Sequence, residues 1–208
     1  MTVLSRILFT TITCTITCTL ISPVYAALSP DDRIWLIGDS LGVLIKPYLA
    51  EKAKAEGLTF GGSPVAGSTI IQWDVSLWRE KWRMRAFKPT IVIVVLGAND
   101  ACLAPHVIAN EPPFLKSLNR QLNRTKARVV WMGPPKIGST EPLLCWSMKD
   151  CLARAVPGLD AFKAMVVAEG ATYLDGRNAG AEMGTDLLHP TVKGRVTWVN
   201  WAWDELKR

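Results

Sequence analysis

The sequence is poor in the residues that bind metal ions. Its 208 residues include only two histidines, His106 and His189, and no C-x-x-C pair. A structural zinc site takes four nitrogen or sulfur ligands at short, regular spacings. The sequence therefore predicts no zinc centre, and we expect the protein to need neither a metal nor an organic cofactor.

A concentrated basic stripe is also missing. Lys and Arg number 24 against 18 Asp and Glu, which gives a net charge of +6 at neutral pH. Proteins that bind nucleic acids gather such charge on one face or along one helix. We therefore expect no nucleic-acid partner, and the mild surplus favours contact with anionic envelope polymers or lipid headgroups.

The N-terminal apolar stretch is too diluted to make a good membrane-spanning helix. Residues from Ile7 to Leu28 carry no charge but include six Thr, one Ser and one Pro. Arg6 before this stretch and Val24-Tyr25-Ala26 near its end fit a secretory signal peptide, with an uncleaved anchor as the alternative. We expect residues 1–26 to be removed and residues 27–208 to form one domain, a secreted or periplasmic monomer.

Three cysteines remain in the predicted domain, an odd number for an oxidising compartment. Cys145 and Cys151 would close a short loop and are the first candidates for a disulfide. A link from Cys102 to either of them is the alternative, if their loops are neighbours in space.

Predicted strands alternate with predicted helices throughout the domain. The strands cover residues 34–37, 59–62, 91–96, 128–132 and 171–174, and the helices cover 41–56, 73–87, 112–126, 159–169 and 191–207. The run Ile91 to Leu96 has no polar alternation, as in parallel strands buried on both faces. The pattern predicts an α/β fold, a parallel sheet covered by helices on both faces, with a site at the carboxyl ends of the strands.

Two other segments have a choice of roles. The predicted helix 73–87 mixes Trp78 and Trp82 with several arginines. We expect an aromatic face packed on the sheet and a basic face in solvent, with a sugar or headgroup platform as the alternative. Residues 136–158 are irregular and suit a rim loop or a lid.

Ser40 stands at the first strand-to-helix turn, in Gly38-Asp39-Ser40-Leu41. Its hydroxyl would lie at the carboxyl end of a strand and beside a helix N-terminus, where a nucleophile is well placed. An ordinary turn or N-cap would use the same residues. The Asp39 and Asp100 side chains are expected to stabilise turns by accepting hydrogen bonds from backbone amides.

Three more strand-end loops carry polar or glycine motifs, namely Gly67, Gly97-Ala98-Asn99-Asp100 and Asp186-Leu187-Leu188-His189-Pro190. With the Ser40 turn, these four segments in this order resemble the four sequence blocks of the SGNH, or GDSL, hydrolase family. The resemblance runs from about Ile34 to Trp203. It implies a three-layer α/β/α fold with a five-stranded parallel sheet in flavodoxin-like order, and a serine hydrolase without a cofactor.

The chemistry can also be argued from the residues. A serine hydroxyl needs a base within hydrogen-bond reach, and the base needs a group that holds its tautomer. His189 follows Asp186 by three residues, so one short loop can present the pair to Ser40. These three residues are the predicted catalytic set.

The backbone N–H groups of Ser40 and Gly67 and the side-chain amide of Asn99 would supply an oxyanion hole, and the resemblance assigns them this role. His106 has no carboxylate nearby in the sequence and is given no role.

We therefore expect an exported esterase that cleaves carboxylic esters through an acyl-enzyme, with a small ester or an acylated glycan or lipid as substrate. A carbohydrate O-acetylester is one candidate. A lysophospholipid or an acyl thioester, an acyl transfer to a sugar, and a non-catalytic envelope-binding domain on the same fold remain alternatives.

Overall fold

The computed structural model describes residues 27–101, 112–137 and 158–208. The expected signal peptide, His106 and all three cysteines of the domain lie outside these residues, as does most of segment 136–158.

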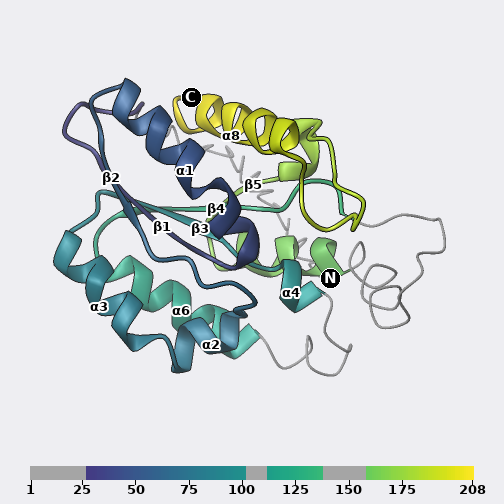
Figure 1. The fold of residues 1–208 in the computed structure, drawn as a ribbon. Helices are drawn as coiled ribbons and strands as arrows, with labels where there is room; N and C mark the ends of the chain where they lie inside the picture. The colour runs from purple at the N-terminus through teal and green to yellow at the C-terminus, as the bar shows by residue number, and fades with distance from the viewer. Residues whose placement is uncertain (1–26, 102–111, 138–157) are drawn as a thin grey trace, which may run out of the picture.

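A five-stranded parallel sheet forms the centre of the molecule (Figure 1). Its spatial order is β2-β1-β3-β4-β5, the flavodoxin-like order that the resemblance to the SGNH family implies. Each predicted strand is present with its ends within two residues: β1 (Arg33–Gly38), β2 (Thr59–Gly62), β3 (Ile91–Val95), β4 (Arg128–Met132) and β5 (Thr172–Leu174).

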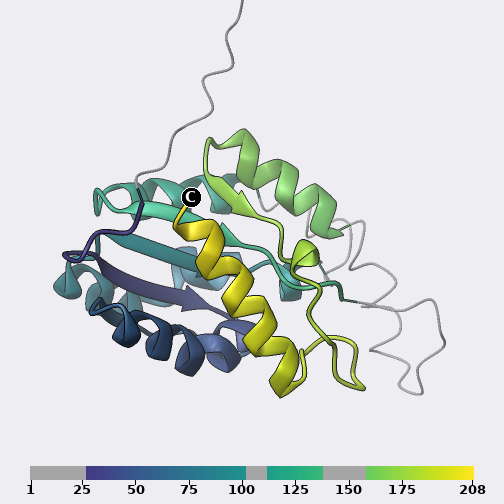
Figure 2. The same ribbon diagram turned by 90° about the horizontal axis from the view of Figure 1, so that it is seen from above.

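Helices cover both faces of the sheet, so the fold has three layers (Figures 1 and 2). One face holds α1 (Ser40–Ala55) and α8 (Val192–Leu206), which pack against each other. The other face holds α2 (Ile70–Val75), α3 (Trp78–Phe87), α6 (Pro112–Asn123) and a helix over residues 158–168. Two short helices, α4 (Ala98–Ala101) and the 3-10 helix η1 (Gly176–Ala179), lie in loops that follow strands.

The central strands are buried on both sides because their side chains alternate between two apolar cores. In β1, Ile34 and Leu36 face the core beneath α1 and α8, whereas Trp35 and Ile37 face the core on the opposite side. This double burial explains the uninterrupted apolar runs of the sequence.

The predicted helix 73–87 is wrong in one respect, because the structure has two helices there. Thr69 begins α2 with a capping box, and the chain turns at Ser76 before α3 begins. The buried ammonium of Lys81 donates to the Asp74 carbonyl at the end of α2, 2.6 Å away, and to Gln121 Oε1 of α6, 2.9 Å away. These contacts satisfy a carbonyl that the break leaves free.

The expected packing of this aromatic face is also wrong. Trp78 and Trp82 are 64% and 66% exposed, and the buried side of α3 is formed by Lys81 and Met84. Trp73 alone of the three tryptophans in this region is buried, and it belongs to α2.

Within the described ranges, no helix has the length and apolar character needed to cross a membrane.

Candidate active site

Ser40 is the first residue of α1 and is separated from the carboxyl end of β1 by Asp39 alone. Asp39 caps the helix, since its Oδ1 accepts a hydrogen bond of 2.9 Å from the Leu41 N–H. The expected turn role of Asp39 is thus confirmed. The cap holds the half-buried Ser40 side chain at the helix N-terminus, where free N–H groups favour developing negative charge.

Asp39 itself is fully buried beneath this turn. Burial raises the pKa of its carboxyl group from 3.8 to about 7; the Leu41 N–H opposes this shift, and the Asp100 carboxylate adds to it. Its second oxygen, Oδ2, is buried and accepts no hydrogen bond from the described residues. The residue before the candidate nucleophile therefore changes charge near neutral pH.

Asp186 and His189 share a short loop that closes onto itself. Asp186 Oδ1 accepts from the backbone N–H groups of Leu188 and His189, at 3.1 and 2.9 Å, and the Gly184 N–H donates to the His189 carbonyl at 2.8 Å. Leu187 adopts a left-handed backbone with φ of 54°, an uncommon conformation for a leucine. This tight turn brings a carboxylate and an imidazole three residues apart into contact.

The loop lies against the Ser40 turn, although 149 residues separate Ser40 from His189. His189 Nε2 is 3.1 Å from Ser40 Oγ, and His189 Nδ1 is 2.7 Å from Asp186 Oδ2. The structure thus brings all three predicted catalytic residues into one hydrogen-bonded line. In this line Asp186 can hold the Nδ1 proton, which leaves Nε2 able to accept a proton from the hydroxyl.

The Asp186 carboxylate is held in its ionised form. Partial burial opposes ionisation, but hydrogen bonds from the backbone and the ring of His189, with one from the Leu188 N–H, outweigh it and lower the Asp186 pKa. An ionised Asp186 can stabilise a positive charge on the His189 ring.

The loop that contains Gly67 is attached to the end of β1. The Val65 N–H and the Ser68 hydroxyl both donate to the Gly38 carbonyl, at 2.8 and 3.1 Å. Gly67 has a φ of +74°, a backbone conformation that residues other than glycine rarely adopt. Gly61 and Gly62, by contrast, belong to strand β2. This difference identifies Gly67 as the glycine of the loop.

Asn99 connects the end of β3 to the same loop. Its side-chain amide donates one hydrogen bond of 3.0 Å to the Ser68 carbonyl. The amide carries two hydrogens, so one donor remains for a ligand. The backbone N–H groups of Ser40 and Gly67 donate no hydrogen bond within the described ranges, which leaves them available as well.

Asp100 completes these connections. Its Oδ1 accepts a hydrogen bond of 2.9 Å from the Ile70 N–H, at the beginning of α2. The expected bond to an amide is therefore present, and it joins two strand-end loops thirty residues apart.

A cavity of about 450 Å³ opens beside Ser40, Asp186 and His189. Residues that sequence reasoning missed complete its lining: Val43, Leu44, Ala66 and Arg195. Arg195 Nε donates to the carbonyl of Pro190, next to His189, at 3.0 Å. Val43 and Leu44 lie on α1, Arg195 lies on α8 and Ala66 lies in a loop of small residues, and none of these positions predicts a pocket from the sequence. The one available signal is the spacing of Arg195 from His189, which is less than two helical turns.

No model of a protein family matches this chain, and no curated protein does. Solved structures with a similar fold include a GDSL-like lipase from Bacteroides thetaiotaomicron, with 14% identity, 84% of this chain and 87% of that chain covered, and a TM-score of 0.61. A psychrotrophic esterase from Pseudoalteromonas matches at 21% identity, 85% and 97% coverage, and a TM-score of 0.61.

An acetylxylan esterase from Geobacillus stearothermophilus matches at 14% identity, covering 85% of this chain and 94% of that one, with a TM-score of 0.62. At such identities the likeness concerns the fold, and the aligned regions include 87% to 97% of each solved chain. The chain therefore has the fold of the SGNH, or GDSL, hydrolases.

Proposed function

We propose that this protein is an exported serine esterase of the SGNH/GDSL family, which hydrolyses carboxylic esters through an acyl-enzyme. The observation that supports it most is the line from Ser40 through His189 to Asp186, with contacts of 3.1 and 2.7 Å. The esterases and lipases among the structures of similar fold agree with this proposal. Export is inferred from residues 1–26 of the sequence.

In the first half of the reaction, Ser40 Oγ attacks the ester carbonyl carbon while His189 Nε2 accepts the hydroxyl proton. Asp186 keeps Nδ1 protonated and stabilises the imidazolium that forms. Collapse of the tetrahedral intermediate breaks the bond to the alcohol, which leaves with the proton from Nε2. Ser40 then carries the acyl group.

A water molecule releases the acid in the second half. His189 Nε2 accepts a proton from this water, whose oxygen attacks the acyl carbonyl carbon. When the second tetrahedral intermediate collapses, Ser40 Oγ departs and regains its proton from His189. The enzyme returns to its starting state.

In both halves negative charge develops on the carbonyl oxygen of the substrate. We assign its stabilisation to the backbone N–H groups of Ser40 and Gly67 and to the second amide hydrogen of Asn99, which have no partner within the described residues. Loss of one such donor typically lowers the rate by about 10²–10³.

The proposed substrate is an O-acetylated carbohydrate. The cavity is lined by the apolar side chains of Val43, Leu44 and Ala66, which suit the acyl part of an ester. Two solved structures of similar fold are described as acetyl xylan esterases. A lysophospholipid or an acyl thioester is the alternative substrate.

Hydrolysis of p-nitrophenyl acetate, butyrate and octanoate tests the reaction. Wild-type protein should cleave the acetate fastest, and Ser40→Ala should reduce the rate to the uncatalysed background. Ser76→Ala is the matched control, because Ser76 is an exposed serine at the end of α2 that does not line the cavity beside Ser40. If wild type and Ser40→Ala are equally slow, the protein is a non-catalytic binding domain.

The nature of the substrate needs a direct comparison. Free acetate released from an O-acetylated polysaccharide is measured beside fatty acid released from a lysolipid, each with wild type and Ser40→Ala. Fatty acid as the main product would replace the carbohydrate proposal by the lysophospholipase one. Acetyl groups transferred to an added sugar, instead of to water, would identify an acyltransferase, which uses the same residues but excludes water.

A further inference from the structure

Helix α3 presents two indole rings to solvent. Trp78 and Trp82 are 64% and 66% exposed, and they lie one helical turn apart on the same side. Arg85 continues this stripe one turn further on, at i+7 from Trp78. The Arg79 guanidinium lies over the Trp78 ring, 5.3 Å from its centroid.

The outward direction of these rings is built into the packing. The opposite side of α3 is held by buried Met84 and by buried Lys81, which bonds to Asp74 and to Gln121. Rotation of α3 to bury Trp78 would expose this ammonium contact and break two hydrogen bonds. The indoles are therefore kept in solvent by the fold itself.

A basic cluster adjoins the tryptophan stripe. A cavity of about 660 Å³ lies between the ends of α3 and α6, and four of its seven lining residues are basic: Arg85, Lys88, Arg124 and Lys126. All four are exposed. Trp78, Trp82 and these four residues together are called the Trp–Arg face below.

The charge of this face is not neutralised by the chain. None of its four basic residues, nor Arg79 or Arg83 beside it, forms an ion pair with another described residue. Acidic groups in the same region are Glu80 on α3 and Asp32, which accepts a hydrogen bond from the lining residue Thr90. The surface thus offers positive charge beside apolar rings.

We propose that the Trp–Arg face binds the surface of a membrane that contains anionic lipids. Trp side chains favour the boundary between headgroups and acyl chains, because the apolar ring contacts the acyl chains there while its N–H group stays hydrated. Basic side chains beside them are attracted to anionic headgroups, and the cavity between α3 and α6 can admit a phosphate group. A polyanion without apolar groups, such as polyphosphate, would use the charges but would leave the indoles in water.

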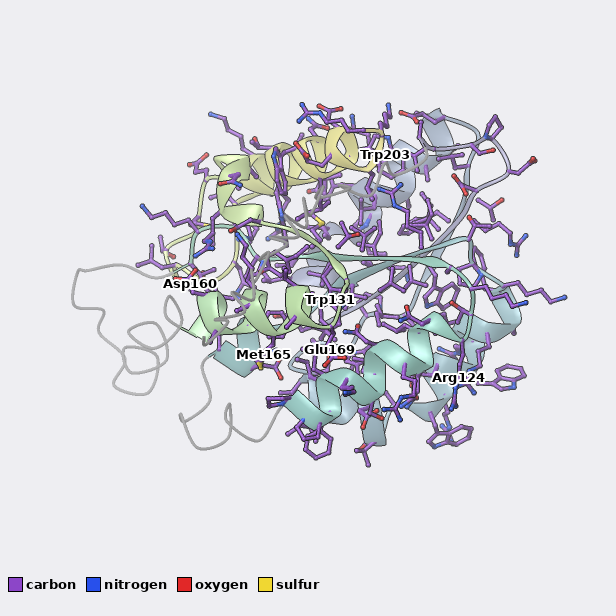
Figure 3. The ribbon with its side chains drawn as sticks, turned by 180° about the vertical axis from the view of Figure 1, so that it is seen from behind. Arg124, Trp131, Asp160, Met165, Glu169 and Trp203 are labelled. Carbon is purple, nitrogen blue, oxygen red and sulfur yellow. The ribbon has the colours of Figure 1, made fainter. Side chains whose placement is uncertain are left out.

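This face lies at the opposite edge of the sheet from the proposed active site. Lys88 and Lys126 precede the parallel strands β3 and β4, whereas Ser40 follows β1. Asp160 lies near the start of the helix over residues 158–168, which leads back along the sheet to the beginning of β5. Figure 3 shows Arg124 and Asp160 at opposite ends of the molecule. A bound protein would hold its Ser40 cavity away from the lipid, open to a substrate in the surrounding solution, and the proposal does not depend on esterase activity.

Sedimentation with vesicles tests the proposal. The full chain is mixed with phosphatidylcholine vesicles and with vesicles that contain about one third phosphatidylglycerol. Each basic side chain near an anionic surface strengthens binding roughly fivefold, so Arg85→Gln/Arg124→Gln should weaken binding to the anionic vesicles about 25-fold. Trp78→Ala/Trp82→Ala should weaken binding to the anionic vesicles about tenfold or more. Binding of the wild-type protein should weaken steeply as salt is added.

Lys54→Gln/Lys193→Gln is the matched control, because it removes the same charge from exposed residues of α1 and α8 on the other face of the sheet. It should bind within about twofold of wild type. Equal loss in both double variants would attribute binding to net charge and overturn the proposal. Equal binding to neutral and anionic vesicles would also overturn the proposal. The same holds if the protein binds an acidic polysaccharide but no vesicles, or if it forms a dimer that the Trp substitutions dissociate. Circular dichroism of each variant checks that it is folded.

Discussion

Replacing Asp39 by Asn should remove a pH-dependent cost to folding. Asp39 is buried beneath the Ser40 turn, and its Oδ1 caps α1 through the Leu41 N–H. Asn caps helices about as well as Asp, so this bond can be kept. What the substitution removes is the charge.

The magnitude follows from the pKa. In the unfolded chain the Asp39 proton dissociates near pH 3.8, whereas burial and the Asp100 carboxylate hold it in the folded protein until about pH 7. Between these values the folded state binds more protons than the unfolded state, so the free energy of unfolding falls as pH rises. The stabilisation that comes from the raised Asp39 pKa is fully present below pH 3.8 and is lost as the pH rises to about 7. Since one pKa unit corresponds to about 1.36 kcal/mol, the free energy of unfolding falls by about 3 kcal/mol between pH 5 and pH 8.

Urea unfolding of wild type and Asp39→Asn at several pH values from 5 to 8 measures this effect. Other titrating groups, such as Asp186, are common to both proteins and largely cancel in the difference. We expect the variant to gain about 3 kcal/mol over wild type across this range. Parallel stability profiles would show that Asp39 does not titrate near neutral pH, and would refute the reasoning.

The remaining predictions concern the site and the packing of α3. His189→Ala should lower kcat/KM for p-nitrophenyl acetate at least about a thousandfold, as loss of a general base does, and full activity would contradict its assigned role. Asn99→Ala should lower kcat by about 10²–10³ while changing KM less, because its amide acts on the charge that develops in the transition state; an unchanged kcat would remove it from the oxyanion hole. Lys81→Met should lower the free energy of unfolding by about 1–3 kcal/mol, measured with urea, because it removes the donor to the Asp74 carbonyl and to Gln121 Oε1. Unchanged stability would mean that water replaces the ammonium.

The sheet can be predicted from the sequence because a buried parallel strand has a local signature. Ile91 to Val95 are β-branched or apolar throughout, and a proline precedes the run while a glycine follows it. The same reasoning locates the strand-end residues, since the carboxyl ends of parallel strands share one edge of the sheet.

The break between α2 and α3 could not be predicted in this way. No glycine or proline marks it, and the Lys81 contacts that stabilise it reach Gln121, forty residues away. The sequence also did not reveal that Trp78 and Trp82 face solvent. A helix with apolar and basic residues on several sides has no single face that can be predicted to be buried.

The sequence by itself determined the five strands and their alternation with helices, and it put a serine, an asparagine, an aspartate and a histidine in the loops that follow strands. Only the tertiary structure decided that Ser40 Oγ and His189 Nε2 lie 3.1 Å apart, and that Val43, Leu44 and Arg195 line their cavity. The physical reason is one of range. Hydrophobic periodicity and turn chemistry act over a few residues, whereas a hydrogen bond between residues 149 apart depends on the packing of every layer between them.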